Sequence, residues 1–272
     1  MSIAHELESN WHNSTAGQYL LAKEQALYDQ AVFDLFGFKA VQMGSSHMDL
    51  LRNSRIPNRY HAAGFPVSTS TDTPFETHLC CCDDFLPFAD MSLDLLLLPH
   101  RLEFSERPHQ TLREAARVMM PEGHLLISGF NPLSTWGATA GINKWLFKNQ
   151  TYPWNGKFIG LTRLKDWLAL LGFEVISVET CCHVPPFEQP SWHKRSAFMD
   201  KVGMRCCARL GGDYFIVAKK RVVGMTPIKP NWKTTPLKSA LAVRQPKSNT
   251  VQSNSVQSNS VQSKPVQKTV KK

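Results

Sequence analysis

The chain has 272 residues, of which 42% are apolar and 10% aromatic, so it can bury a sizeable core and is not wholly disordered. Its formal net charge is +9, from 31 Lys and Arg against 22 Asp and Glu. Nine of the basic residues and none of the acidic ones fall in residues 222–272, which leaves residues 1–221 without net charge. The body therefore lacks the overall basic character typical of a nucleic-acid-binding domain.

The seven cysteines occur in three groups of adjacent residues, at 80–82, 181–182 and 206–207. Neighbouring residues of a strand face opposite ways, so such groups favour neither a disulfide framework nor a zinc site, and no CxxC spacing occurs. The first fourteen residues do not resemble a secretory signal, and no apolar run is long enough to span a bilayer. We predict a reduced, soluble, cytoplasmic protein with no membrane contact.

Helix and strand patterns alternate along the first third of the chain. The first helix is predicted to bury Leu20, Leu27, Ala31 and Leu35 on one side. The expected elements are a helix at 17–36 capped by Gly37, a strand at 38–43, a short helix at 47–51, and strands at 59–63 and 78–82.

The clearest pattern lies in the middle of the chain. Residues 93–98 are almost entirely Leu, as expected of a strand covered on both faces in a parallel sheet. Pro108 then begins a segment whose apolar residues recur every three or four positions, and residues 121–123 are expected to end that helix. Residues 124–128 form the next expected strand. A strand, a helix and a parallel strand make a right-handed βαβ unit.

The remaining elements complete an α/β pattern. They are expected to be a helix at 136–145, a loop at 149–160, a helix at 163–171 capped by Thr162, a strand at 173–180, an irregular segment at 184–209 and a strand at 213–220. Seven strands with helices between them predict a doubly wound sheet with helices on both faces. We assign residues 1–221 to this domain. Residues 222–272 contain several prolines and a repeated five-residue unit, and predict a disordered basic tail.

Residues 86–137 carry a family resemblance. The spacing of Leu86-Pro87-Phe88, Asp90, Asp94, Leu112-Arg113-Glu114, Arg117-Val118, Pro121 and Gly123 resembles that of class I S-adenosylmethionine (SAM)-dependent methyltransferases of the type 11 family. The continuation GFNPLSTWG, from Gly129 to Gly137, resembles a small bacterial subgroup of that family. The resemblance implies a Rossmann-like fold with an antiparallel last strand pair, SAM as cofactor, and methyl transfer to an acceptor that it does not name.

The same resemblance shows where this chain departs from its family. An acidic residue followed by several glycines is usual at the end of the first strand, whereas this chain has Gln42-Met43-Gly44-Ser45-Ser46. The acidic residue usual at the end of the second strand is replaced by Ala62-Ala63-Gly64. The adenine-contacting Asp of the family aligns with Cys82, and Asp83 and Asp84 follow it directly. One of these two aspartates could take over that contact with a shift of one residue.

Ligands of open α/β sheets bind beyond the carboxyl ends of the strands. The candidate cofactor-binding residues are accordingly Gln42, Met43, Gly44, Ser46, Cys82, Asp83, Asp84, Phe85, Pro99 and His100. Gly44 would allow close backbone approach, although a strand-ending turn explains it equally, and Asp83 and Asp84 could be turn formers. His100 and Glu103 are the catalytic candidates, with His100 as general base if the acceptor arrives protonated, although a surface loop pair explains them equally. No metal site is expected, including at Cys181-Cys182-His183.

Several aromatic residues follow the fifth expected strand, and they could cover a substrate or simply pack in the core. They are Trp136, Trp145, Tyr152, Trp154 and Phe158.

Three functions remain open from the sequence. The leading one is a SAM-dependent methyltransferase that acts on a small molecule. The departures at residues 42–46 favour, as an alternative, a SAM-fold scaffold that no longer catalyses. The basic tail suggests a nucleic-acid-associated protein, but its charges are diluted by polar residues and the body offers no matching charge.

Overall fold

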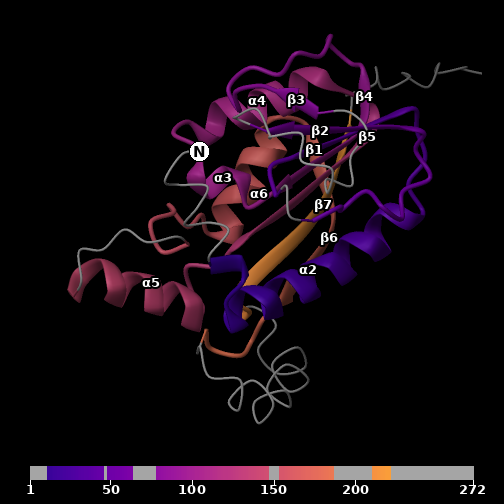
Figure 1. Cartoon of the computed structure of the whole chain (residues 1–272). Helices are drawn as coiled ribbons and strands as arrows, with labels where there is room; N and C mark the ends of the chain where they lie inside the picture. Colours follow the sequence, from indigo (N-terminus) through magenta and orange to yellow (C-terminus); the bar gives the residue numbers. More distant parts are fainter. Residues whose placement is uncertain (1–10, 46–47, 64–77, 147–152, 187–209, 222–272) are drawn as a thin grey trace, which may run out of the picture. The chain divides into compact units, whose positions relative to one another are not determined.

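The computed structural model describes residues 11–45, 48–63, 78–146, 153–186 and 210–221. All of them belong to one structural unit, Met1–Thr226 (Figure 1). The predicted tail, 222–272, and most of the segment expected to be irregular, at 187–209, lie outside the described residues. No helix in the described part is long and apolar enough to cross a membrane.

A single seven-stranded sheet organises the described residues, in the order β3-β2-β1-β4-β5-β7-β6. Its strands are β1 (Lys39–Met43), β2 (Asn58–Ala63), β3 (His78–Cys80), β4 (Leu93–Pro99), β5 (Met119–Phe130), β6 (Phe173–Cys181) and β7 (Asp213–Lys220). β7 pairs antiparallel with both β5 and β6, and all the other pairs are parallel. The predicted fold class, including the antiparallel end, is confirmed.

Strand order reverses between β1 and β4, because the chain first builds outward to β2 and β3 and then returns to the other side of β1. The connection that follows β1 therefore leads toward one edge of the sheet, and the connection that follows β4 leads toward the other edge. In doubly wound sheets such a switch point leaves room for a ligand.

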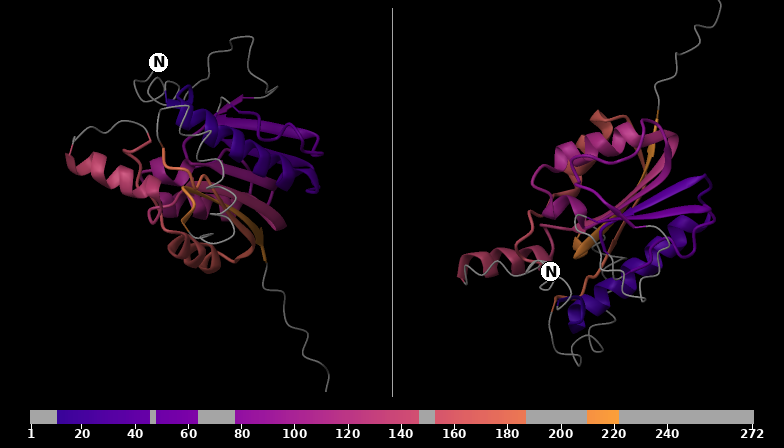
Figure 2. Two further views of the ribbon diagram at one scale, coloured as in Figure 1. Left: turned by 90° about the horizontal axis from the view of Figure 1, so that it is seen from below. Right: turned by 45° about the horizontal axis from the view of Figure 1, so that its top comes forward.

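Helices cover both faces of the sheet, as Figures 1 and 2 show. The helices of the described part are α2 (Thr15–Phe33), α3 (Arg101–Phe104), α4 (Pro108–Val118), α5 (Thr135–Leu146) and α6 (Leu161–Leu170), and of these α5 extends away from the sheet. Leu95 and Leu97 of β4 pack with residues of α2, whereas Leu96 and Leu98 pack with residues of α4 and α6. The leucine run of β4 is thus explained by burial on both faces.

Helix α2 buries a different stripe from the predicted one. Its buried positions include Leu20, Glu24, Tyr28 and Val32, which are spaced by four residues, whereas Leu27 is only half-buried. The buried stripe differs because it includes a charged residue, Glu24, which an apolar pattern leaves out. A carboxylate in the buried stripe of a helix needs a charged or hydrogen-bonding partner.

The end of α2 also differs from the prediction. Its C-cap is Asp34, so the expectation that Gly37 caps the helix was wrong. The following segment is instead held by Asp94 of β4, whose Oδ2 accepts hydrogen bonds from the amides of Phe38 (2.8 Å) and Lys39 (3.0 Å). This contact fixes the start of β1 beside β4.

The short helix expected at 47–51 is replaced by a turn at residues 50–53. The Gln42 side chain binds the carbonyl of Met48 (2.7 Å) and the amide of Leu50 (3.0 Å). Because these backbone groups bond to a side chain, they are withdrawn from a helical ladder.

Two other boundaries were predicted wrongly. Helix α6 begins at Leu161 with Gly160 as N-cap, and Thr162 lies inside it. Strand β5 begins at Met119, so residues 121–123 lie within the strand instead of ending the preceding helix. Glu122 has a positive φ of 66°, which marks the irregular point of this long strand.

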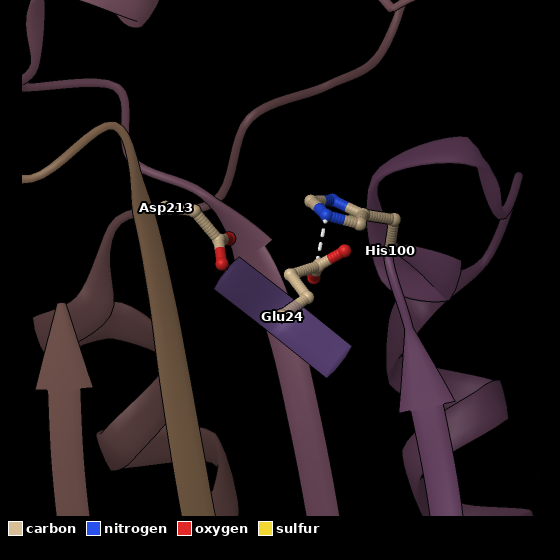
Figure 3. A group of neighbouring side chains, drawn as sticks. All are labelled: Glu24, His100 and Asp213. Atoms are coloured by element: carbon tan, nitrogen blue, oxygen red, sulfur yellow. Dashed lines mark ion pairs between the residues drawn. The ribbon is translucent and has the colours of Figure 1, made fainter. Parts of the chain in front are cut away.

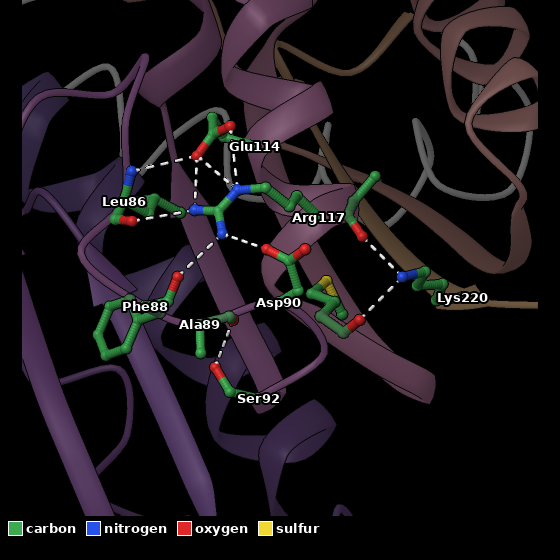
Figure 4. A network of polar contacts seen from close by, with 10 residues as sticks. Leu86, Phe88, Ala89, Asp90, Ser92, Glu114, Arg117 and Lys220 are labelled. Atoms are coloured by element: carbon green, nitrogen blue, oxygen red, sulfur yellow. Dashed lines mark hydrogen bonds and ion pairs between the residues drawn. The ribbon is translucent and has the colours of Figure 1, made fainter.

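Five of the residues that carry the family resemblance form one polar network (Figure 4). Arg117 of α4 donates to the carboxylate of Glu114 (2.9 Å) and to Asp90 (2.6 Å). It also donates to the carbonyls of Leu86 (3.1 Å) and Phe88 (3.0 Å). The guanidinium therefore fastens the loop between β3 and β4 to helix α4, which is a structural reason for the spacing of these residues.

Candidate active site

Two buried side chains, Gln42 and His61, hold the turn after β1 by contacts to its backbone carbonyls. Gly44 and Ser45 both have positive φ, 77° and 49°. This backbone conformation favours glycine, which explains the glycine at position 44. The Gln42 amide donates to the carbonyls of Gly44 (3.2 Å) and Ser45 (3.1 Å), and the Nε2 atom of His61 lies 2.9 Å from the Gly44 carbonyl. These contacts hold the turn in one shape at the edge of the sheet.

Four of the predicted cofactor residues lie in this segment, and the structure places them differently. Gln42 is fully buried and bonds only to backbone groups in the contacts above, and Met43 packs in the core. Gly44 lies against Arg101, because a Cβ at this position would be in van der Waals contact with the Cδ (3.6 Å) and Nη1 (3.7 Å) atoms of that side chain. Ser46 lies outside the described residues.

The loop after β3 brings polar groups to the same edge. A tight turn is closed by the amide of Phe85, which donates to the carbonyl of Cys82 (3.2 Å), and both residues are exposed. Asp83 and Asp84 between them are half-buried. The carboxylate of Asp83 accepts a hydrogen bond of 2.6 Å from Arg101 Nε, so the loop is tied to helix α3.

Arg101 connects all three loops that leave β1, β3 and β4. It directly follows His100, it pairs with Asp83, and its Cδ and Nη1 are the atoms that a Cβ on Gly44 would meet first. The three loops therefore converge within contact distance of one guanidinium.

A second group of buried charged residues surrounds His100, which directly follows the buried Pro99 at the end of β4. His100 has a positive φ of 47°, which turns its side chain between two carboxylates. Its Nε2 lies 2.9 Å from Glu24 Oε1 (Figure 3), and its Nδ1 lies 3.1 Å from Glu103 Oε2. The side chains of His100, Glu24 and Glu103 are 6%, 4% and 1% exposed, so this is a buried ion-pair group.

The two carboxylates decide the protonation of His100. Burial alone would lower the pKa of His100, but the charges of Glu24 and Glu103 and their hydrogen bonds outweigh burial, and the pKa lies well above its usual value. Burial likewise acts to raise the pKa of Glu24, but the charge and hydrogen bond of His100 prevail and lower it. The carboxylate that faces each ring nitrogen favours the charged, imidazolium form of His100. His100 is therefore not poised to accept a proton.

The ends of β5 and β7 complete the group. The Gly129 amide donates to Asp213 Oδ1 (3.0 Å), and the Phe130 amide donates to Glu103. A side chain at Gly129 would collide with the Tyr214 hydroxyl, since a Cβ there would lie 2.6 Å from that oxygen. Burial raises the pKa of Asp213 well above its usual value, and the neighbouring Cys181 adds to this effect.

Glu24, His100 and Asp213 could also hold a cation, because one ligand atom of each lies within 4.8 Å of the others. Imidazole and carboxylate donors suit several divalent transition metals. Such an ion would have to displace the proton on His100 Nε2 and break its contact with Glu24.

Comparison with known proteins identifies the family. A family model described as a methyltransferase domain matches residues 65–127. The uncharacterized protein YafS of Escherichia coli K12 is 36% identical over 187 residues, which cover 68% of this chain and 69% of that protein. The chain belongs to the class I SAM-dependent methyltransferases of the type 11 family.

Two solved structures support the fold of this methyltransferase. A SAM-dependent methyltransferase from Thermotoga maritima is 19% identical, with a TM-score of 0.53 over 73% of this chain and 89% of that chain. One from Mesorhizobium loti is 13% identical, with a TM-score of 0.52 over 72% of this chain and 96% of that chain. The cofactor of the family is S-adenosylmethionine, as the resemblance in the sequence implied.

Sequence reasoning missed three residues of this candidate site, Glu24, Arg101 and Asp213. Glu24 had a usable signal, because it lies four residues from both Leu20 and Tyr28 on the buried face of α2. Arg101 and Asp213 had only a weaker signal. Arg101 lies shortly after the end of β4, and Asp213 is the first residue of β7, at the same edge of the sheet.

Proposed function

We propose that this methyltransferase transfers the methyl group of SAM to a small molecule that binds at the carboxyl edge of the sheet, beside His100. The observation that carries the proposal is the convergence of Gly44, Asp83 and Arg101 from three loops at the switch point. Gly44, which has no side chain to block a close approach, and the two charged side chains suit a ligand with both an adenosyl part and a charged amino-acid part.

Bound SAM supplies an activated methyl group with a good leaving group, so the chain mainly has to align the acceptor and exclude water. In the proposal, His100 and Glu103 act as positioning residues. They link α2, α3 and the end of β5 through buried contacts, and so fix the floor of the acceptor side. A general base is assigned to neither of them, because the His100 nitrogens face carboxylates.

Phe130 and Trp136 are fully buried in a core cluster beside His100, and the half-buried Phe158 and Trp154 that pack on this cluster would offer an apolar face to a small acceptor. The ring of Phe130 lies 4.2 Å from that of His100 between centroids, and Phe158 stacks on Phe130 at 5.0 Å. Trp154 and Trp136 continue this wall, at 6.2 Å from each other. Trp136 is fully buried, whereas Trp145 is 81% exposed and takes no part.

The experiment is an incubation of the pure protein with methyl-labelled SAM and a cell extract separated into small molecules, protein and nucleic acid. The proposal expects enzyme-dependent label in the small-molecule fraction, above that of a heat-inactivated control. Label confined to protein or nucleic acid would contradict the proposed acceptor class.

The rival function, a scaffold that no longer catalyses, is favoured by Gln42 at the usual acidic position and by the Asp83–Arg101 pair at the loop junction. It predicts no label in any fraction. Calorimetry with SAM then tells a scaffold that still holds the cofactor from one that does not.

A further inference from the structure

We propose that Glu24, His100 and Asp213 bind a divalent transition-metal ion inside the fold, with Glu103 orienting the ring of His100. This departs from the expectation that the chain holds no metal. It does not depend on the proposed function, because a buried ion needs neither SAM nor an acceptor. The ion-paired His100 described above, and its response to pH, belong to the metal-free protein.

The first step is the position of the three side chains, which point toward one another in Figure 3. Glu24 lies on α2, His100 directly follows β4, and Asp213 begins β7. His100 Nε2 and Glu24 Oε1 are 2.9 Å apart, and a ligand atom of Asp213 lies within 4.8 Å of both partners. Metal–ligand bonds of about 2.0–2.2 Å place neighbouring ligand atoms about 2.9–3.4 Å apart, so a small side-chain rotation brings all three atoms to one ion.

The second step is the hydrogen bonding of these side chains. Two buried atoms that face each other, His100 Nε2 and Glu24 Oε1, have no aligned hydrogen-bond partner among the described residues. The outward atoms are bonded: His100 Nδ1 lies 3.1 Å from Glu103 Oε2, and Asp213 Oδ1 accepts from the Gly129 amide at 3.0 Å. Metal ligands typically have this arrangement, in which an outer partner orients each ligand while the ligand atom faces the ion.

The third step is charge balance. The group combines three carboxylates, those of Glu24, Glu103 and Asp213, with the single imidazole of His100, and all four residues are buried. Burial raises the pKa of Asp213 well above its usual value, so without an ion Asp213 keeps a proton. An ion of charge +2 would replace one proton on Asp213 and one on His100. The total charge of the buried group would not change.

The donor set selects the class of ion. One imidazole nitrogen and two carboxylate oxygens suit Zn²⁺ and similar transition-metal ions, whereas Mg²⁺ and Ca²⁺ prefer oxygen ligands alone. Three protein ligands leave a coordination position for water, as in open zinc sites. Because the ligands belong to α2 and to the ends of β4 and β7, a bound ion should also raise the melting temperature of the protein.

The test uses the full chain after removal of metal with a chelator, and without SAM. Zn²⁺ and Mg²⁺ are titrated by calorimetry, Co²⁺ is followed by its visible absorption, and the melting temperature is measured with and without each ion. The inference expects one Zn²⁺ or Co²⁺ per chain, a higher melting temperature, and much weaker binding of Mg²⁺. The cobalt spectrum should lack the charge-transfer band of a thiolate ligand.

Matched variants locate the ion. Glu24→Gln and Asp213→Asn each remove a charged ligand but keep its size and a carbonyl oxygen. Each should weaken Zn²⁺ by at least about 10- to 100-fold, the loss known even for an outer partner, and abolish the rise in melting temperature. Glu103→Gln, at the outer partner, should weaken Zn²⁺ by about 10- to 100-fold. The control, Cys80→Ser with Cys82→Ser, removes two exposed thiols and should bind as the wild type does.

Three results would overturn the inference. One is a folded wild type that binds neither Zn²⁺ nor Co²⁺ at millimolar concentration. Another is unchanged Zn²⁺ affinity in Glu24→Gln and Asp213→Asn. The third is a thiolate band in the cobalt spectrum of the wild type, which places the ion at cysteines and decides the question even where a variant fails to fold.

Discussion

The most informative single residue is His100, because three elements meet at its imidazole. Glu24 faces it from α2, Glu103 from α3 and Asp213 from β7, and His12 adds a further charge that acts on Glu24. In sequence order these groups are far apart, so no local pattern could predict that they meet. The expectation that His100 sits at a functional strand end survives as a proposal, but its suggested role as a free base does not fit its two carboxylate partners.

His100 gives the pH-dependent prediction. Its pKa is raised in the folded protein, so its contribution to stability is complete below the unfolded value near 6.5 and is lost as the pH rises through the folded value. Replacing Glu24 with Gln should lower the pKa of His100, because one of its two negative partners is removed. Imidazole signals followed by NMR across a pH titration measure both values. A wild-type pKa at or below 6.5 would contradict the ion-pair arrangement.

Gly129 allows a second test at this scale. Gly129→Ala should reduce the free energy of unfolding by about 1–3 kcal/mol, because its methyl group would overlap the Tyr214 hydroxyl and crowd Glu103. Gly141→Ala in α5 is the matched control, since no atom lies within 4 Å of the added methyl, and alanine favours a helix by about 0.5–1 kcal/mol. Urea denaturation compares the two. Equal effects would mean that the close approach at Gly129 is unimportant.

At the scale of elements, the sequence predicted best where burial is continuous. The leucine run of β4, helix α4 and strand β7 lie where the apolar pattern put them, because each is covered by neighbours on a predictable face. Predictions failed where side chains took over backbone groups, as Gln42 does at residues 48–50. They also failed where a polar residue is buried by a distant partner, as Glu24 is.

The network around Arg117 makes a prediction about the contact between α4 and the loop before β4. The charges and hydrogen bonds of Glu114 and Asp90 raise the pKa of Arg117, so it stays charged at any ordinary pH. Arg117→Met should cost about 1–3 kcal/mol of unfolding free energy, because the buried carboxylate of Glu114 and two backbone carbonyls lose a donor.

A double-mutant cycle isolates that contact. Glu114→Gln combined with Arg117→Met should cost less than the sum of the single changes, since both remove the same interaction. Additive effects would show that the two side chains act independently.

At the scale of the whole molecule, the strand order and the antiparallel end could be expected only through the family resemblance, because hydrophobic patterns do not specify which strands are neighbours. The resemblance covered the second half of the sheet well. It could not predict how this chain replaces the usual acidic residues, which depends on contacts such as that between Asp83 and Arg101.

The account depends most on where an adenosyl ligand binds. A crystal structure of the protein with S-adenosylhomocysteine tests this directly. We expect ligand density beside Gly44, between the loops that follow β3 and β4. Density at another surface, or an Asp83–Arg101 pair that still closes this position in a protein saturated with ligand, would contradict the account.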